Sequence, residues 1–137
     1  MFLSNFLSNL TLSRANAFIW DSKIKNLKII SNFKCLDLDL LVGIERQKKT
    51  ILNNTINFAE GNFTNNALLW GSRGNGKSSL IKSIFYEINK NNKNLKLIQL
   101  NKNNIFDIEV IYEKYANLKN YNFIIFIDDL SFEKIDS

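Results

Sequence analysis

The sequence contains no histidine and no proline, and its only cysteine is Cys35. The absence of histidine excludes the imidazole ligands of most zinc sites and any catalytic triad that depends on histidine. One cysteine cannot form a disulfide framework or a cysteine-based metal cluster. No run of eighteen apolar residues occurs, so the sequence predicts no membrane span. The first residues lack the basic region and small-residue cleavage site of a secretory signal, which favours a cytoplasmic location.

The chain has 137 residues, an apolar content of 45%, which is enough to bury a core, and a formal net charge of +5. A positive balance can indicate nucleic acid as a partner. The lysines are scattered, however, and Lys48-Lys49 is the only adjacent pair, so a composition bias explains the charge better. We divide the chain into an N-terminal extension, residues 1–35, and a domain, residues 36–137, that carries the motifs described next.

The most informative stretch is residues 71–78, which read GSRGNGKS and match the phosphate-binding P-loop pattern G-x-x-x-x-G-K-[ST]. A short apolar run over residues 66–70 precedes it and predicts a buried strand. Apolar residues at helical spacing follow it. Strand, glycine loop and helix in this order form the arrangement in which the motif binds phosphate. The apolar residues of the predicted helix are Leu80, Ile81, Ile84, Phe85 and Ile88.

The residue types of this loop explain its expected chemistry. Gly71, Gly74 and Gly76 let the backbone N–H groups turn inward around an anion, and the positive end of the following helix points to the same place. We expect the Lys77 ammonium to contact the β- and γ-phosphates of a nucleotide and the Ser78 hydroxyl to bind Mg²⁺. The alternative is a glycine-rich turn with an exposed lysine. The expected nucleotide-binding residues of the loop are Gly71, Ser72, Arg73, Gly74, Asn75, Gly76, Lys77, Ser78 and Ser79.

A second motif is the continuous apolar run over residues 123–127, which ends in Asp128-Asp129. Such a run is typical of a strand that is covered on both faces in a parallel sheet. Carboxylates at the carboxyl end of this strand lie where open α/β sheets bind ligands. We expect Asp128 to hold Mg²⁺ opposite Ser78, and Asp129 to polarise an attacking water. For Asp129 the alternative is a solvated carboxylate in a turn.

The rest of the chain alternates strands with helices, which predicts a three-layer α/β fold with a parallel sheet. The amphipathic helix at the start carries five apolar residues on one face, Phe2, Leu3, Phe6, Leu7 and Leu10. We favour packing of this face on its own domain, and the alternative is an interfacial anchor or a helix that docks to a partner. Asn103 or Asn104 is the expected cap of the last helix, whose apolar face includes Ile105 and Tyr112. The expected elements are a helix over 1–12, a strand over 27–30, an extended segment over 36–41, a helix over 44–59 ended by Gly61, a strand over 95–100 and a helix over 103–118.

Five stretches of the sequence carry a resemblance to a known family. They are residues 43–47 (GIERQ), 53–55 (NNT), 65–71 (NNALLWG), 76–80 (GKSSL) and 128–133 (DDLSFE). Together they resemble the bacterial ATPases of the domain of unknown function 815 family, which belong to the AAA+-like P-loop ATPases, and the similarity runs from about residue 15 to the last residue. The resemblance implies a core that binds ATP and Mg²⁺, similar to that of bacterial replication initiators and helicase loaders, with a homo-oligomer or a client protein as partner.

The resemblance also implies roles for individual residues. Val42 and Gly43 form the segment expected beside the adenine, while Lys77, Ser78 and Asp128 keep their phosphate and Mg²⁺ roles. Asp129 stands where most AAA+ proteins have a glutamate and is one methylene shorter. In AAA+-type sheets a further strand lies between the P-loop strand and the strand that ends at Asp128.

The sequence ends at Ser137, before that further strand, an arginine finger or a lid could follow. We therefore expect the core to be incomplete, with a gap in the sheet that leaves backbone N–H and C=O groups unpaired. Such a chain should bind nucleotide weakly and hydrolyse it poorly or not at all. We interpret the 137 residues as the N-terminal part of a longer ATPase.

Two other functions remain open. In a kinase-like phosphotransferase the P-loop strand lies directly beside the strand of the second acidic motif, so no gap would exist, although the arginine-rich lid of such enzymes is not visible here. A non-hydrolysing module that binds nucleotide or a partner ATPase is the third possibility. The adjacency of the two strands separates the first reading from the second.

Overall fold

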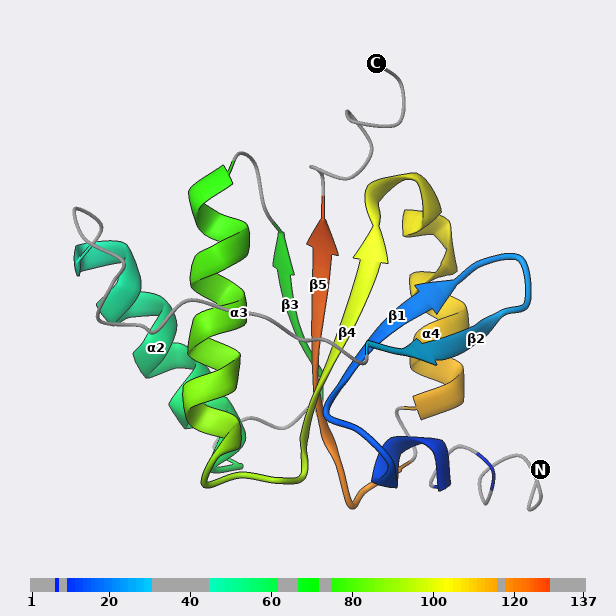
Figure 1. Cartoon of the computed structure of the whole chain (residues 1–137), viewed down its shortest axis with the longest axis horizontal. Coiled ribbons are helices and arrows are strands. Elements are labelled where there is room, and N and C mark those ends of the chain that lie inside the picture. The colour runs from blue at the N-terminus through cyan, green and yellow to red at the C-terminus, as the bar shows by residue number, and fades with distance from the viewer. Residues whose placement is uncertain are drawn as a thin grey trace.

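The computed structural model describes residue 7 and residues 10–30, 45–61, 67–71, 75–115 and 118–128. These residues form a five-stranded sheet in the order β2-β1-β4-β5-β3, with helices on both faces (Figure 1). The expected three-layer α/β architecture is confirmed. The elements are β1 (Ala17–Asp21), β2 (Asn26–Ile29), α2 (Glu45–Ala59), β3 (Ala67–Gly71), α3 (Asn75–Asn89), β4 (Leu95–Asn101), the 3-10 helix η2 (Lys102–Asp107), α4 (Ile108–Tyr115) and β5 (Asn122–Asp128).

The sheet is mixed rather than parallel throughout. β1, β4, β5 and β3 run parallel to one another, whereas β2 pairs antiparallel with β1 and forms one edge. The expectation of a parallel sheet is therefore wrong for β2. A tight turn, in which Lys25 adopts a positive φ of 52°, connects β1 to β2. A hairpin between adjacent strands must be antiparallel. Both strands of this hairpin come from the segment assigned to the N-terminal extension, and they belong to the same sheet as β3, β4 and β5.

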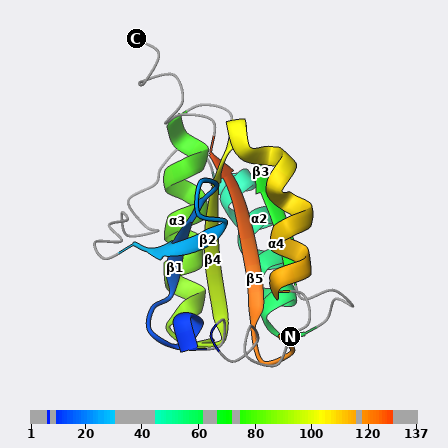
Figure 2. The same cartoon turned by 90° about the vertical axis from the view of Figure 1, so that its right-hand side faces the viewer.

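Side chains alternate between two cores, one on each face of the sheet. Figure 2 shows α3 on one side of the sheet and α4 on the other. On β5, Phe126 packs toward α2 and α3, and its neighbour Ile125 packs toward α4. Burial on both faces explains the continuous apolar run of this strand. The core on the α3 side contains Ala17, Phe58, Leu80, Ile81, Ile84, Phe85, Ile88, Leu95, Leu97, Ile124 and Phe126. The core on the α4 side contains Leu12, Phe18, Trp20, Leu27, Ile98, Leu100, Ile111, Tyr115, Leu118, Phe123 and Ile125.

The helix predicted over residues 44–59 is confirmed as α2. Its end is set by Gly61, which adopts a φ of 81° and donates its backbone N–H to the carbonyl of Phe58 at 3.0 Å. Glycine reaches this left-handed conformation without the steric cost that a Cβ imposes, so it commonly ends a helix. Phe58 is 1% exposed and packs in the core on the α3 side, which holds α2 against the sheet.

The region after β4 differs from the prediction of one helix capped by Asn103 or Asn104. The cap is Asn101, whose side chain accepts a hydrogen bond from the backbone N–H of Asn103 at 2.9 Å, and the first turns are the 3-10 helix η2. The backbone kinks at Asn104. As a result Ile105, predicted to lie on the apolar face, is 43% exposed, and Tyr112 is 37% exposed. The predicted apolar face also included Ile111 and Tyr115, and these two residues of α4 are buried. Leu118, where the helix was expected to end, is buried but lies beyond the end of α4 at Tyr115.

The expected gap in the sheet does not exist, because β3 and β5 pair directly. The register runs in parallel from Ala67 opposite Phe123 to Gly71 opposite Ile127. β5 therefore has a hydrogen-bonded neighbour on each side, β3 and β4. The expectation of two unpaired rows of backbone groups between these strands is wrong.

The start of the chain is described only in part. Residues 10–13 are helical, as predicted, and Leu12 is fully buried in the core on the α4 side. Leu7 and Leu10, expected on the face that packs on the domain, are 51% and 41% exposed, so that expectation is wrong for these two residues. Phe2, Phe6 and the extended segment predicted over residues 36–41 lie outside the described residues. Within the described part of the chain, no helix has the length and apolar character needed to cross a membrane.

The buried Tyr115 predicts a loss of stability at high pH. Tyr115 is 3% exposed and its ring lies 5.7 Å from that of Phe123, and burial raises the pKa of its hydroxyl to about 12. Below pH 10 the hydroxyl is protonated in both states. Between pH 10 and 12 it ionises in the unfolded chain first, so we expect the free energy of unfolding to fall by up to about 2–3 kcal/mol.

Urea unfolding of the wild type and Tyr115→Phe at pH 8, 10 and 11 measures this contribution. Tyr115→Phe should remove the part of the decrease in unfolding free energy that ionisation of Tyr115 causes. Tyr112→Phe, at the half-exposed tyrosine of the same helix, should leave the decrease unchanged. Equal decreases in the wild type and Tyr115→Phe would contradict the prediction.

Candidate functional site

The two sequence motifs meet at the carboxyl edge of the sheet. The register places Gly71, the last residue of β3, opposite Ile127, and places Asn101 of β4 opposite Asp128 of β5. The three strands thus end at nearly the same level. The helix α3 begins at Asn75, four residues after β3 ends, and its first turn lies at this end of the sheet (Figure 1). This edge is where parallel α/β sheets bind their ligands.

The strand predicted before the glycine loop and the helix predicted after it are confirmed as β3 and α3. Gly71 ends the strand. The backbone of Asn75 through Ser79, which includes Gly76, Lys77 and Ser78, forms the first turns of α3. The side-chain positions of these five residues are outside the description, as are Ser72, Arg73, Gly74, Val42, Gly43 and Asp129 as a whole.

The helix α3 is held firmly against the sheet, so its N-terminal end has a defined place. All five apolar residues predicted from the helical spacing are buried, with between 1% and 6% of each side chain exposed. They pack on β4 and β5 and on α2. The first N–H groups of a helix lack partners within the helix and carry a partial positive charge, which favours an anion at this end.

Asp128 lies on the same face of the sheet as α3. Phe126 belongs to the core on the α3 side, and side chains two positions apart on a strand point to the same face. Asp128 is 6% exposed, and its Oδ2 accepts a hydrogen bond from Nε2 of Gln99 at 3.0 Å. This hydrogen bond fixes the orientation of the Asp128 carboxylate at the carboxyl edge of the sheet.

Gln99 is the residue of this site that the sequence reasoning missed. It stands on β4 opposite Phe126, and Leu95 and Leu97, at alternate positions before it, belong to the core on the α3 side. In the sequence, Gln99 could have been noticed as an amide side chain that follows Leu95 and Leu97 on the same face of the strand. Such a polar group on a buried face needs a hydrogen-bonding partner, and a carboxylate on the neighbouring strand supplies it.

The described part of this edge offers one carboxylate as an oxygen donor, that of Asp128. Among the described residues no cluster of three or more His, Cys, Asp and Glu side chains could hold a metal ion. Mg²⁺ needs no such cluster, because it is commonly bound by one or two carboxylates together with water and phosphate oxygens. The Asp128 carboxylate, on the α3 face and close to the level at which β3 ends, provides one such oxygen ligand.

Comparisons with known proteins give one positive result. No curated protein and no solved structure matched the chain. The family model described as "Protein of unknown function (DUF815)" matches residues 13–137, which include every strand and the helices α2, α3 and α4. The chain therefore belongs to the DUF815 family, and the matched region of this chain includes its glycine loop and Asp128.

Proposed function

We propose that the protein binds ATP with Mg²⁺ at the carboxyl edge of its sheet and acts as a P-loop ATPase. The AAA+-like form of this proposal rests on the resemblance alone, because the direct pairing of β3 with β5 is not the strand order that the AAA+ type implies. The observation that supports this most is the arrangement of the two motifs. The first turn of α3, which contains Lys77 and Ser78, and the buried carboxylate of Asp128 lie at one end of the sheet and on one of its faces. A P-loop requires that the first turn of the helix and the carboxylate lie at the same site. A glycine-rich turn with an exposed lysine would not require a carboxylate there.

In this proposal each residue acts by position and charge. The N–H groups at the start of α3 and the Lys77 ammonium surround the phosphates, which concentrates positive charge where negative charge develops during transfer. The Ser78 hydroxyl and the Asp128 carboxylate hold Mg²⁺, and Gln99 fixes the orientation of that carboxylate. Asp129 orients the attacking water. When bound, Mg²⁺ would neutralise charge on the phosphate oxygens.

Calorimetric titration with ATP, with and without Mg²⁺, tests the proposal on the wild type and Asp128→Asn. The wild type should bind ATP more tightly with Mg²⁺. The asparagine is isosteric and can still accept from Gln99, but it lacks the charge that holds the ion. We therefore expect the variant to keep its affinity for ATP without Mg²⁺ and to lose about 10- to 100-fold in the affinity for Mg²⁺ on the ATP-loaded protein.

The matched control for this titration is Glu109→Gln, which removes one exposed carboxylate from α4 and should change neither affinity. If wild-type protein binds no ATP at millimolar concentration, with or without Mg²⁺, the proposed nucleotide site is wrong. If Asp128→Asn responds to Mg²⁺ as the wild type does, the assignment of Asp128 is wrong while the site itself stands.

A small-molecule phosphotransferase is the second candidate, and one observation favours it. β3 and β5 are direct neighbours in the sheet, as in kinase-like P-loop folds, where no strand lies between the two motifs. The release of ADP distinguishes the two functions. An ATPase transfers the phosphoryl group to water, so ADP should form without an added acceptor. ADP formation that starts only when a compound with an acceptor hydroxyl is added would favour the phosphotransferase.

A further inference from the structure

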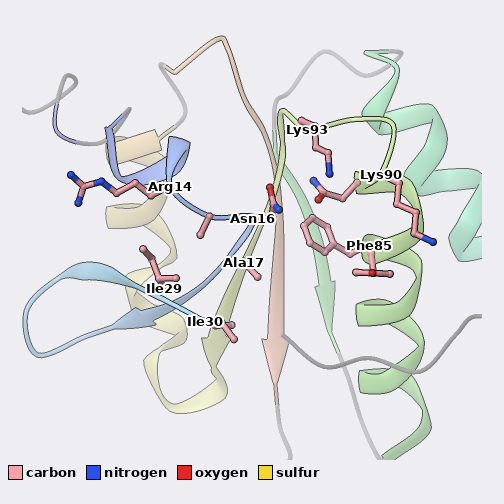
Figure 3. Close-up of a pocket in the computed structure, with 11 residues that line it drawn as sticks. Arg14, Asn16, Ala17, Ile29, Ile30, Phe85, Lys90 and Lys93 are labelled. Carbon is pink, nitrogen blue, oxygen red and sulfur yellow. The ribbon is translucent and has the colours of Figure 1, made fainter. Parts of the chain in front are cut away.

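A second concave surface lies at the amino edge of the sheet, away from the proposed nucleotide site. It opens between the start of β1, the end of β2 and the last turns of α3, and it has a volume of about 530 Å³ (Figure 3). Pockets for small molecules usually have volumes of about 300–1,000 Å³. The residues that line it are Arg14, Ala15, Asn16, Ala17, Ile29, Ile30, Phe85, Tyr86, Asn89, Lys90 and Lys93.

The charged lining residues of this cleft are all cations. Arg14, Lys90 and Lys93 contribute them, and no carboxylate is among the lining residues. Lys90 pairs with Glu87 at 3.0 Å, and its ammonium lies 5.1 Å from the centre of the Tyr86 ring. Within the described part of the chain, Arg14 and Lys93 form no ion pair. The cleft therefore has uncompensated positive charge.

A buried lysine fixes the polar wall of the cleft. Lys96 is 5% exposed, and its Nζ donates to the backbone carbonyl of Ala15 at 2.8 Å and to Oδ1 of Asn16 at 3.2 Å. An ammonium can only donate, so the Asn16 oxygen must face Lys96, which leaves the two N–H donors of its amide for another acceptor. Burial lowers the pKa of Lys96, and the positive charge of Lys93 lowers it further. The charge of Lys93 is therefore felt at this wall of the cleft.

Apart from Asn89, the remaining lining residues are apolar or aromatic, and they come from three segments of the chain. Ala17 and Phe85 are buried at 3% and 2% exposure and form the floor, while Ile29 and Tyr86 are 45% and 49% exposed at the sides. In Figure 3 the Lys93 side chain extends into the space between Asn16 and the end of α3, whereas Arg14 and Lys90 point away on opposite sides of the opening. Apolar surface and hydrogen-bond donors thus face the same volume.

We propose that this cleft binds a small organic anion, with an apolar body against Phe85, Tyr86 and Ile29 and a carboxylate at Lys93 and Asn16. The exposed Arg14 adds a further positive charge at the edge of the cleft, which favours an anion over a neutral ligand. The half-enclosed volume and the convergence of three chain segments favour a small molecule over an extended partner. This ligand does not depend on ATP binding at the opposite edge.

Titration of ¹⁵N-labelled protein with naphthalene-2-carboxylate, followed by amide chemical shifts, tests the proposal. The largest shifts should occur at Asn16, Ile30, Asn89 and Lys93. The neutral analogue 2-naphthylmethanol should bind at least about tenfold more weakly, because it leaves the cations without a charged partner. The double variant Arg14→Gln/Lys93→Gln should weaken binding of the carboxylate by a similar factor.

The control Lys23→Gln removes one exposed lysine from the turn after β1, outside the cleft, and should leave the affinity unchanged. The affected lysine and arginine side chains are exposed, so the variants should fold, and their spectra check this directly. The proposal is overturned if the neutral analogue binds as tightly as the carboxylate, or if the largest shifts lie elsewhere. Tighter binding of a short peptide rich in leucine and aspartate would make the cleft a peptide-docking surface and would also overturn it.

Discussion

Replacing Lys77 by alanine is expected to lower the affinity for ATP by about 10- to 100-fold, which corresponds to the loss of one charge-assisted hydrogen bond of about 1.5–3 kcal/mol. Lys77 lies in the first turn of α3, where the helix N-terminus already favours an anion. The backbone N–H groups remain in the variant, so weak binding should persist. The loss should be larger for ATP than for AMP, since the lysine contacts the β- and γ-phosphates in the proposed arrangement.

The matched control is Lys82→Ala, on the same helix but beyond its first turn. It removes the same charge and shortens the side chain equally, and alanine favours the helix at both positions. Fluorescence titration with a labelled ATP analogue measures both variants. Similar losses for Lys77→Ala and Lys82→Ala would show a general charge effect, and they would remove the assignment of Lys77 as a phosphate ligand.

Local patterns predicted the parts of the fold that local physics decides. The burial of Leu80, Ile84 and Ile88 follows from a spacing of three and four residues, which places them on one helix face. The end of α2 at Gly61 follows from the conformational freedom of glycine. The run that became β5 is apolar on both faces, and a strand between two helical layers requires this. Each of these features depends on a few neighbouring residues.

The choice of strand neighbours depends on residues far apart in the sequence, and there the prediction failed. The direct pairing of β3 with β5 joins segments about 50 residues apart, and the backbone groups of both strands are satisfied by it. The sequence reasoning placed a missing strand between them because the resemblance to AAA+-type ATPases implied one. The cap at Asn101 was also not predicted. The strand β4 extends one residue beyond its apolar pattern, so the following helix begins earlier than expected.

The candidate site was predictable in its residue types and only partly in its geometry. A glycine loop and a carboxylate after a buried strand are visible in the sequence, and the structure places the backbone of α3 and the side chain of Asp128 at one edge. Gln99 could not be linked to Asp128 without the register of β4 on β5. The cleft at the amino edge was also invisible, because it joins the start of β1 to the end of α3.

The largest effect on stability is expected at Phe126, in the middle layer of the molecule. Its side chain is fully buried in the core on the α3 side, and β5 has a neighbouring strand on each side, so the surrounding structure cannot easily collapse into a cavity. We expect Phe126→Ala to lower the free energy of unfolding by about 3–5 kcal/mol, the usual cost of such a truncation. A domain of this size has a total stability of about 5–15 kcal/mol, so the variant would keep only part of it.

Phe106→Ala is the matched control, because it makes the same chemical change at a residue that is 90% exposed on η2. Its expected effect is within about 0.5 kcal/mol of zero. Urea unfolding followed by tryptophan fluorescence measures both variants, since Trp20 lies in the core on the α4 side. Equal effects of the two substitutions would contradict the placement of β5 between two helical layers. A large effect of Phe126→Ala alone supports that placement, and it ties the position of Asp128, two residues further along the strand, to the integrity of the core on the α3 side.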